Sequence, residues 1–427
     1  MQTKTYPRLG EQVIWQQLPN GLPIAIVPRP GFTKKLCYFV TDFGAIHTAF
    51  TMDGKDYQVP AGIAHYLEHK MFDLPDRDVT AEFAALGAIP NAFTSYDLTA
   101  YYFSCTENFP QALDLLLEFV STPYFTDETV RKEQGIIGQE IDMNRDNPDT
   151  QIFEMLMENM YENHPIRVPI LGDRDSIARI TPQTLTACHR AFYRPDNMLL
   201  CIVGDVDPEE VADIAQKRLG NPQLPPVSRV RRWEEAMTCP AAYGEKTMDV
   251  SMPTFHLGFK SEPWEPGEAA VRREITAELA AEALFGESSR LYQSLYEQGL
   301  IDTSFGGGFE TIDGMSLFTA SGDSNDARAV VDAILNRAGE IAEKGLEEAD
   351  FLRMKRSALG RRIRSLDSFE ATCYRLCAYY FSGFDYFRFP AIYQSVSLPD
   401  VQAFLKSTVT AQRMSLAVIY PPKEDIS

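Results

Sequence analysis

Two histidines and a glutamate lie close together near residue 65 and could hold and use a metal ion. Residues 62–72 read Gly-Ile-Ala-His-Tyr-Leu-Glu-His-Lys-Met-Phe, an apolar segment with no helix breaker after its first residue. On a helix, His65 and His69 project from one face a turn apart, so both imidazoles could bind one Zn²⁺ at about 2.0–2.1 Å. Glu68 lies at the edge of that face, within reach of a water on the metal. His-x-x-Glu-His is the inverted form of the His-Glu-x-x-His zinc motif.

A catalytic zinc site takes three protein ligands, so a third must come from elsewhere in the chain. Glu133 and Glu140 are candidates because they lie seven residues apart, two turns along one helix face. Ile136, Ile137 and Ile141 flank them, and carboxylates on so apolar a face are costly to bury without a cation. Spacing alone would equally fit two solvated glutamates in an acidic protein.

The second half of the chain repeats the order of the first. Residues 182–203 and 399–419 each read as a helix that starts with proline and leads into a buried strand, with an offset of 217 between the prolines. Residues 93–103 and 309–318 both alternate like strands. Similar segments in the same order, at nearly the same offset, predict a tandem repeat.

One repeated pair separates the two halves chemically. Glu133 and Glu140 align with Lys355 and Arg362 at an offset of 222, in segments that share a glycine and an isoleucine in register. The first half therefore presents carboxylates where the second presents cations. This contrast favours metal-binding glutamates over solvated ones, and it predicts that the second half holds no zinc at this place.

The repeat predicts an α+β fold with two domains of about 210 residues each. Prolines are dense in residues 221–228, which disfavours regular structure and indicates the linker. We therefore expect an N-terminal zinc-binding domain over residues 1–222 and a C-terminal domain without a metal motif over residues 234–427.

Charge and composition exclude several classes of protein. Lys+Arg 40 against Asp+Glu 60 gives a formal net charge of −20, which disfavours partners such as nucleic acid or anionic membrane. No apolar run approaches the roughly 20 residues that cross a bilayer, and the first residues contain no apolar signal core. Seven scattered cysteines do not predict a disulfide framework. We expect a soluble, cytoplasmic protein.

These residues resemble those of the pitrilysin- or insulinase-type (M16) metallopeptidases, the inverzincins. His65, Glu68 and His69 match the zinc motif of that family, and Glu133 and Glu140 follow about seventy residues later, as its second acidic element does. The likeness extends over essentially the whole chain.

Further segments resemble the family in the same order along the chain. Residues 91–95 are similar to the edge strand beside its site, and residues 161–172 and 202–206 are similar to later conserved segments. Residues 289–300 resemble a helix of its second domain, and their sequence is most similar to that of the YmfH-like group of Gram-positive bacteria.

The resemblance implies a role for each residue of the site. His65, His69 and Glu140 would be the ligands of one Zn²⁺ per chain. Glu68 would be the general base, and Glu133 a carboxylate that orients a ligand. The fold implied is a pair of tandem α/β-roll domains of the M16 (LuxS/MPP-like) type.

The implied reaction is hydrolysis of peptide bonds, with Glu68 taking a proton from the attacking water. Asn91, Ala92, Phe93 and Thr94 would bind the peptide substrate as an added strand, main chain to main chain. Short chains of this family pair as a clamshell, either homodimer or heterodimer, which encloses short or unfolded peptides.

The chain departs from the family in its second domain. Active members carry an Arg and a Tyr that contact substrate near the zinc, whereas this chain has Tyr296 and Asp302 at about those positions. A homodimer would lack the pair, which favours a heterodimer with a partner that keeps it and lacks the zinc motif.

Three other interpretations stay open at this point. The chain could be a non-catalytic subunit, although His65, Glu68, His69 and Glu140 are all present. Its zinc could be structural, although such sites usually include cysteine. It could also be a maturation peptidase for one dedicated peptide, which differs from an oligopeptidase only in its substrate.

Overall fold

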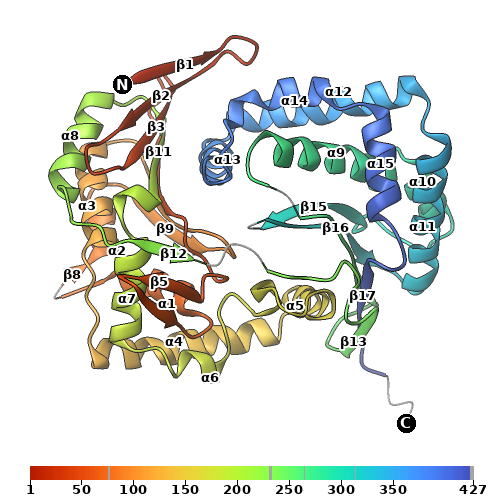
Figure 1. The fold of residues 1–427 in the computed structure, drawn as a ribbon, viewed down its shortest axis with the longest axis horizontal. Coiled ribbons are helices and arrows are strands. Elements are labelled where there is room, and N and C mark those ends of the chain that lie inside the picture. Colours follow the sequence, from red (N-terminus) through yellow and green to blue (C-terminus); the bar gives the residue numbers. More distant parts are fainter. Residues whose placement is uncertain (76, 230–232, 264, 313, 424–427) are drawn as a thin grey trace. The chain divides into compact units, whose positions relative to one another are not determined.

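A computed structural model describes residues 1–427 except 76, 230–232, 264, 313 and 424–427. The chain forms two compact units, each with its own sheet and helices (Figure 1). The first unit comprises Met1–Ile141, Pro169–Val230 and Arg364–Phe387. The second comprises Asp142–Val168, Arg231–Ile363 and Arg388–Ser427. The predicted α+β class with two related domains is confirmed.

The first unit is built on a seven-stranded sheet in the order β1-β2-β3-β11-β4-β10-β9. Strands β3 and β11 run parallel, and every other neighbouring pair is antiparallel. Among the described strands β9 has one neighbour, so it forms an edge of the sheet. The strands are β1 (Gln2–Tyr6), β2 (Glu11–Gln17), β3 (Pro23–Pro28), β4 (Lys35–Thr41), β9 (Ile89–Thr94), β10 (Thr99–Cys105) and β11 (Met198–Gly204).

Helices cover one face of this sheet around a continuous apolar core. Leu200 and Ile202 of β11 point into that core, together with side chains of α1, α3 and α7. The helices of the unit are α1 (Ile63–Met71), α2 (Val79–Ala85), α3 (Phe109–Ser121), α4 (Asp127–Arg145), α6 (Arg174–Ile177), α7 (Pro182–Phe192), α8 (Pro208–Leu219) and α13 (Phe369–Phe381). Its small strands are β5 (Ala49–Met52), β6 (Lys55–Gln58), β7 (Asp73–Leu74), β8 (Arg77–Asp78) and β12 (Val227–Arg229).

The second unit has a five-stranded sheet in the order β13-β17-β14-β16-β15. Its strands are β13 (Tyr243–Thr247), β14 (Thr254–Lys260), β15 (Gly306–Ile312), β16 (Met315–Asp323) and β17 (Met414–Tyr420). Its helices are α5 (Pro148–Met160), α9 (Glu268–Phe285), α10 (Arg290–Glu297), α11 (Ala327–Lys344), α12 (Glu348–Arg364), α14 (Phe389–Ser395) and α15 (Leu398–Thr408).

The two sheets repeat one topology. The order β3-β11-β4-β10-β9 matches β13-β17-β14-β16-β15, with a parallel pair followed by three antiparallel pairs in each. The predicted proline-started helices are α7 and α15, and the buried strands after them are β11 and β17. The internal repeat seen in the sequence is therefore a repeat of structure.

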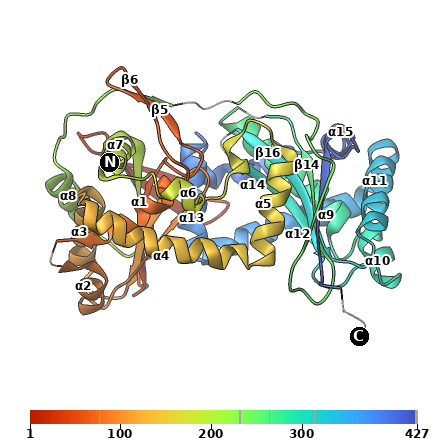
Figure 2. The same ribbon diagram turned by 90° about the horizontal axis from the view of Figure 1, so that it is seen from below.

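Each sheet has its second face covered by a helix from the other half of the sequence. In the first unit α13 packs on β4 and β11, where Cys373 Sγ lies 3.8 Å from Cys201 Sγ. In the second unit α5 packs on β14 and β17 (Figure 2), with Leu156 and Met160 above Gly258. Each compact unit thus includes a helix from the other half of the sequence. The predicted domains, residues 1–222 and 234–427, describe the two copies of the repeat, and their boundary stays a prediction.

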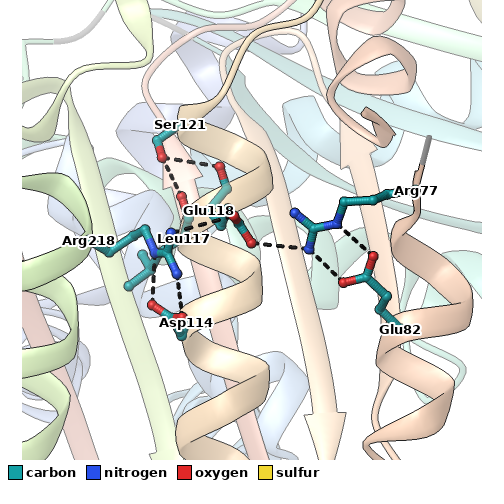
Figure 3. Close-up of polar contacts among 7 residues, drawn as sticks. All are labelled: Arg77, Glu82, Asp114, Leu117, Glu118, Ser121 and Arg218. Atoms are coloured by element: carbon teal, nitrogen blue, oxygen red, sulfur yellow. Dashed lines mark hydrogen bonds and ion pairs between the residues drawn. The ribbon is translucent and has the colours of Figure 1, made fainter. Parts of the chain in front are cut away.

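Exposed ion pairs join the outer helices of the first unit (Figure 3). Arg77 Nη2 lies 2.6 Å from Glu82 and 3.2 Å from Glu118. Arg218 of α8 donates from Nε to Asp114 at 2.8 Å and lies 3.5 Å from Glu118. Surface pairs of this kind contribute about 0–1 kcal/mol each, so the apolar core is what holds α2, α3 and α8 in place. Within the described part of the chain, no helix has the length and apolarity needed to span a bilayer.

Candidate metal centre

Helix α1 carries the His-x-x-Glu-His residues, as predicted, and its start depends on a glycine. Gly62 precedes the helix with φ 84°, and a Cβ on it would lie 2.3 Å from the carbonyl oxygen of Leu171. Only glycine combines this backbone conformation with so close an approach. Ile63 and Leu67 are buried on the core side of the helix, which fixes the direction in which its polar residues project.

Helix α4 supplies the acidic residues and is held against α1 by apolar contacts and one hydrogen bond. Val130, Ile137 and Ile141 are buried, and the Tyr66 hydroxyl of α1 donates to the carbonyl of Val130. Ile136, by contrast, is 47% exposed. Because the buried residues follow helical spacing, the same face of α4 directs Glu133 and Glu140 toward α1.

The two histidines meet a single carboxylate. Nε2 of His65 lies 3.7 Å from Oε1 of Glu140, and Nε2 of His69 lies 3.7 Å from Oε2 of the same residue. The imidazole ring centroids are 4.6 Å apart. One donor atom from each of the three residues lies within 4.8 Å of the others, and this is the one such group among the described residues.

Glu133 contacts His69 on the side away from Glu140. Its Oε1 lies 2.9 Å from His69 Nδ1. A hydrogen bond from Nδ1–H to this carboxylate leaves the lone pair of Nε2 free to face Glu140, the arrangement that a metal-binding imidazole requires. The Glu133 side chain is 15% exposed and is therefore shielded from solvent, whereas the Glu140 side chain is 40% exposed and accessible.

Glu68 is buried and is held by a residue of the edge strand. The Thr94 hydroxyl donates to Glu68 Oε2 at 2.6 Å, and Glu68 is 8% exposed. Burial is the main cause that raises the pKa of Glu68, with the charge of Glu140 adding to it and Thr94 and His69 opposing it. A carboxylate with a raised pKa takes up and releases protons closer to neutral pH than an exposed one.

The environment also sets the charge of the histidines. Burial, and then repulsion by His69, lowers the pKa of His65 to about 3, so this imidazole is neutral and its lone pair is available. Burial opposes a higher pKa at His69, but the hydrogen bond and charge of Glu133, together with Glu68 and Glu140, outweigh it and raise that pKa. A cluster of carboxylates around two imidazoles favours a cation between them.

These donors fit a zinc ion. Tetrahedral ligands about 2.0–2.1 Å from zinc are separated by about 3.4 Å. One donor atom from each of the three residues lies within 4.8 Å of the others, so the three side chains must draw together to bind the ion. Two imidazoles and one carboxylate form a usual catalytic zinc set that leaves the fourth position open. All seven cysteines are free thiols, and none joins this group.

Strand β9 brings the four predicted substrate-binding residues to the edge of the sheet. Thr94 and Ala92 face α1 and the core, whereas Phe93 lies on the other face against Tyr102, with ring centroids 6.2 Å apart. The Asn91 side chain accepts a hydrogen bond from the main-chain N–H of Ala92 at 2.8 Å. Reasoning from sequence missed the contact of Thr94 with Glu68, although the alternation of the strand indicates that Thr94 and Ala92 share a face.

Tyr296 and Asp302 lie in the second unit. Tyr296 is 51% exposed at the end of α10 and stacks on Tyr292, with ring centroids 6.0 Å apart. Asp302 accepts hydrogen bonds from the Ser304 hydroxyl at 2.6 Å and the Ser304 N–H at 2.8 Å, and these bonds lower its pKa. Position 296 thus has a phenol where the resemblance implies a guanidinium, and position 302 has a carboxylate where it implies a phenol.

Comparison with known protein families assigns the two halves separately. Residues 53–174 match the insulinase (peptidase family M16) profile, and residues 179–358 match the profile of the peptidase M16 inactive domain. The zinc protease YmfH of Bacillus subtilis, described as uncharacterized, is 37% identical over 425 residues, which cover 97% of this chain and 98% of that protein.

Solved structures show the same likeness. An M16-like peptidase from Alicyclobacillus acidocaldarius superposes with a TM-score of 0.93 and 31% identity, covering 98% of this chain and 100% of that one. The periplasmic protease PqqL of Escherichia coli gives a TM-score of 0.73 at 17% identity, covering 95% of this chain and 47% of that one. The second likeness concerns the fold alone.

Proposed function

Because the chain belongs to the insulinase (M16) family of zinc peptidases, in its YmfH-like group, we propose that it is a zinc-dependent endopeptidase that uses the site on α1 and α4. The observation that carries this proposal is that both oxygens of Glu140 lie 3.7 Å from the Nε2 atoms of His65 and His69. These three residues are the proposed ligands.

Zinc bound here supplies Lewis-acid chemistry, because it lowers the pKa of a water ligand toward about 7 and polarises a scissile carbonyl. Glu68 acts as the general base: its carboxylate accepts a proton from the attacking water and passes it to the departing amine. Glu133 holds His69 in the tautomer and orientation that metal binding needs.

The edge strand β9 is the proposed substrate platform. A peptide added beside Asn91, Ala92 and Phe93 would bind through main-chain hydrogen bonds, which select little for sequence. To occupy this edge it must replace the bond that the Ala92 N–H makes to Asn91. We expect short or unfolded peptides as substrates, because an extended segment is what an open strand edge accepts.

The central test is Glu68→Gln, which keeps the shape of the side chain and removes its basicity. Loss of general-base catalysis lowers kcat by about 10²–10⁴-fold, while zinc content stays at the wild-type level because Glu68 is not a ligand. Cleavage of a quenched peptide library and elemental analysis measure the two effects. Wild-type turnover by this variant would remove Glu68 from the mechanism.

We also propose that the chain works with a second M16-type chain. It covers 47% of PqqL, and it lacks the Arg/Tyr pair at Tyr296 and Asp302. The partner in a heterodimer would supply that pair and need no zinc motif. Purification from the native cell with identification of every subunit tests this, and a self-dimer with full peptidase activity contradicts it.

The cytoplasm is the proposed location. Seven free thiols, six of them buried, suit a compartment that keeps cysteines reduced. Cell fractionation tests this proposal, and recovery of the chain with secreted proteins would contradict it.

A further inference from the structure

We propose that Thr94 is the positioning residue of the general base: its hydroxyl holds the Glu68 carboxylate toward the metal site and does not donate a hydrogen bond to the substrate. This inference rests on the proposed function, and it deepens the role given to strand β9. It gives the side chain of Thr94 a role through Glu68, whereas the sequence predicted only a main-chain contact of this residue with the peptide.

The hydroxyl hydrogen of Thr94 is already used in a hydrogen bond within the protein. Thr94 donates to Glu68 Oε2 at 2.6 Å, a short bond of the kind that ionised acceptors make. Its other close neighbour is the hydroxyl of Thr99, 3.5 Å away. Thr99 donates its own single hydrogen to the carbonyl of Phe43 at 2.8 Å. Because a hydroxyl has one hydrogen to give, Thr94 has none left for a substrate.

The bond fixes one oxygen of Glu68 and leaves the other to act. Glu68 is on a helix and has three side-chain torsions, so burial alone does not select one orientation of its carboxylate. Oε2 is held by Thr94, and Oε1 is the oxygen left to accept the proton of the water. A base must meet that proton within hydrogen-bond reach, and a displacement of about 1 Å costs on the order of 10²-fold in rate.

The sheet in turn holds Thr94. Thr94 is the last residue of β9 and pairs with Thr99 of β10, and Ala100 pairs with Phe93. Thr99 is fully buried, and its main-chain pairing with Thr94, which does not depend on its hydroxyl, fixes the position of Thr94. Strand β9 is therefore both the proposed binding edge for the peptide and the source of the Thr94 side chain that orients Glu68. This shared strand sets the distance between a bound peptide and Glu68.

The test compares Thr94→Val, which removes the hydroxyl at constant shape, with Thr94→Ser, which keeps it. We expect Thr94→Val to lower kcat by roughly 10- to 100-fold with KM within about twofold of wild type, and Thr94→Ser to stay within about threefold of wild type in both. Zinc content, and the melting temperature of the metal-free protein, should match wild type in the serine variant and change little in the valine variant.

Matched controls separate this role from a structural one. Thr99→Val removes a hydroxyl one step further from Glu68, so we expect it to lower the melting temperature while kcat stays within about threefold of wild type. The proposal is overturned if Thr94→Val keeps full kcat, if it raises KM alone, if it loses zinc, or if Thr94→Ser is as impaired as Thr94→Val.

A crystal structure of metal-free Thr94→Val gives a test that needs no activity. The Glu68 carboxylate should leave its wild-type position, and an unmoved carboxylate would overturn the proposal. Failure of the proposed function looks different, because there the wild-type protein cleaves no peptide, or Glu68→Gln cleaves as well as wild type, whatever Thr94 does.

Discussion

At the residue scale, the site contains three carboxylates that differ in their surroundings and in the roles proposed for them. Glu140 is 40% exposed and faces both imidazoles, Glu133 is 15% exposed and binds the far side of one, and Glu68 is buried beside Thr94. The same functional group thus serves as proposed ligand, orienting partner and base. What differs is which atoms each one faces and how much water reaches it.

The sequence was sufficient to find these residues but not to orient them. Helical spacing predicts that Glu133 and Glu140 share a face, and the resemblance predicts which of them is the ligand. Spacing does not say that Ile137 is buried while Ile136 is exposed, because one apolar run contains both. Thr94 illustrates the same limit, since alternation along a strand does not reveal which face meets a helix that comes earlier in the chain.

At the element scale, the metal helix depends on the loop at its start. Gly62 approaches the Leu171 carbonyl, and Gly172, with φ 68°, approaches Ala61 so closely that a Cβ would lie 2.7 Å from its carbonyl oxygen. Two glycines therefore allow two backbone segments to touch where α1 begins. The motif residues follow within one to two turns, so a shift of this junction moves the proposed ligands.

Gly62→Ala should consequently damage both stability and metal binding. The added Cβ meets a backbone atom at 2.3 Å, so α1 must move, and we expect a loss of about 1–3 kcal/mol of stability with zinc affinity reduced at least tenfold. Thermal unfolding and zinc titration measure the two effects.

Gly87→Ala is the matched control for this substitution. Gly87 has φ 70° but nothing within 4 Å of its Cβ position, so it carries only the conformational cost of about 1 kcal/mol. Equal effects of the two substitutions on zinc affinity would show that the contact with Leu171 does not position the site.

The elements themselves were largely predictable, and their assignment to units was not. Apolar runs and proline starts predict α7, β11, α15 and β17 because these signals are local. The local sequence of α5 or α13 does not indicate which sheet the helix covers, since an amphipathic helix fits any apolar face of suitable shape. The exchange of these helices between units is settled by packing.

At the scale of the whole molecule, the second unit carries a charge-inverted copy of the metal centre. Glu274 and Glu278 lie one turn apart on α9, as His65 and His69 do on α1. The buried Arg362 of α12 places Nη2 3.1 Å from Glu274 and Nη1 3.5 Å from Glu278. A guanidinium paired with two carboxylates thus lies at the place in the fold that corresponds to the proposed metal-binding residues of the first unit.

This inversion accounts for a chain with two related domains and one proposed metal site. The cation of the second unit is a side chain, so that unit needs no ion to balance Glu274 and Glu278. The sequence predicted the cation at Arg362 from the repeat. It did not predict the carboxylates that meet it, because α9 shares no recognisable motif with α1.

The account depends most on one ion held by two imidazoles and a carboxylate in the first unit, and zinc-edge X-ray absorption of the purified full-length chain measures this coordination directly. We predict one zinc per chain, with nitrogen and oxygen neighbours at about 2.0–2.2 Å, imidazole scattering from two histidines, and no sulfur. Sulfur at about 2.3 Å, or an unchanged spectrum in the Glu140→Gln variant, would contradict it.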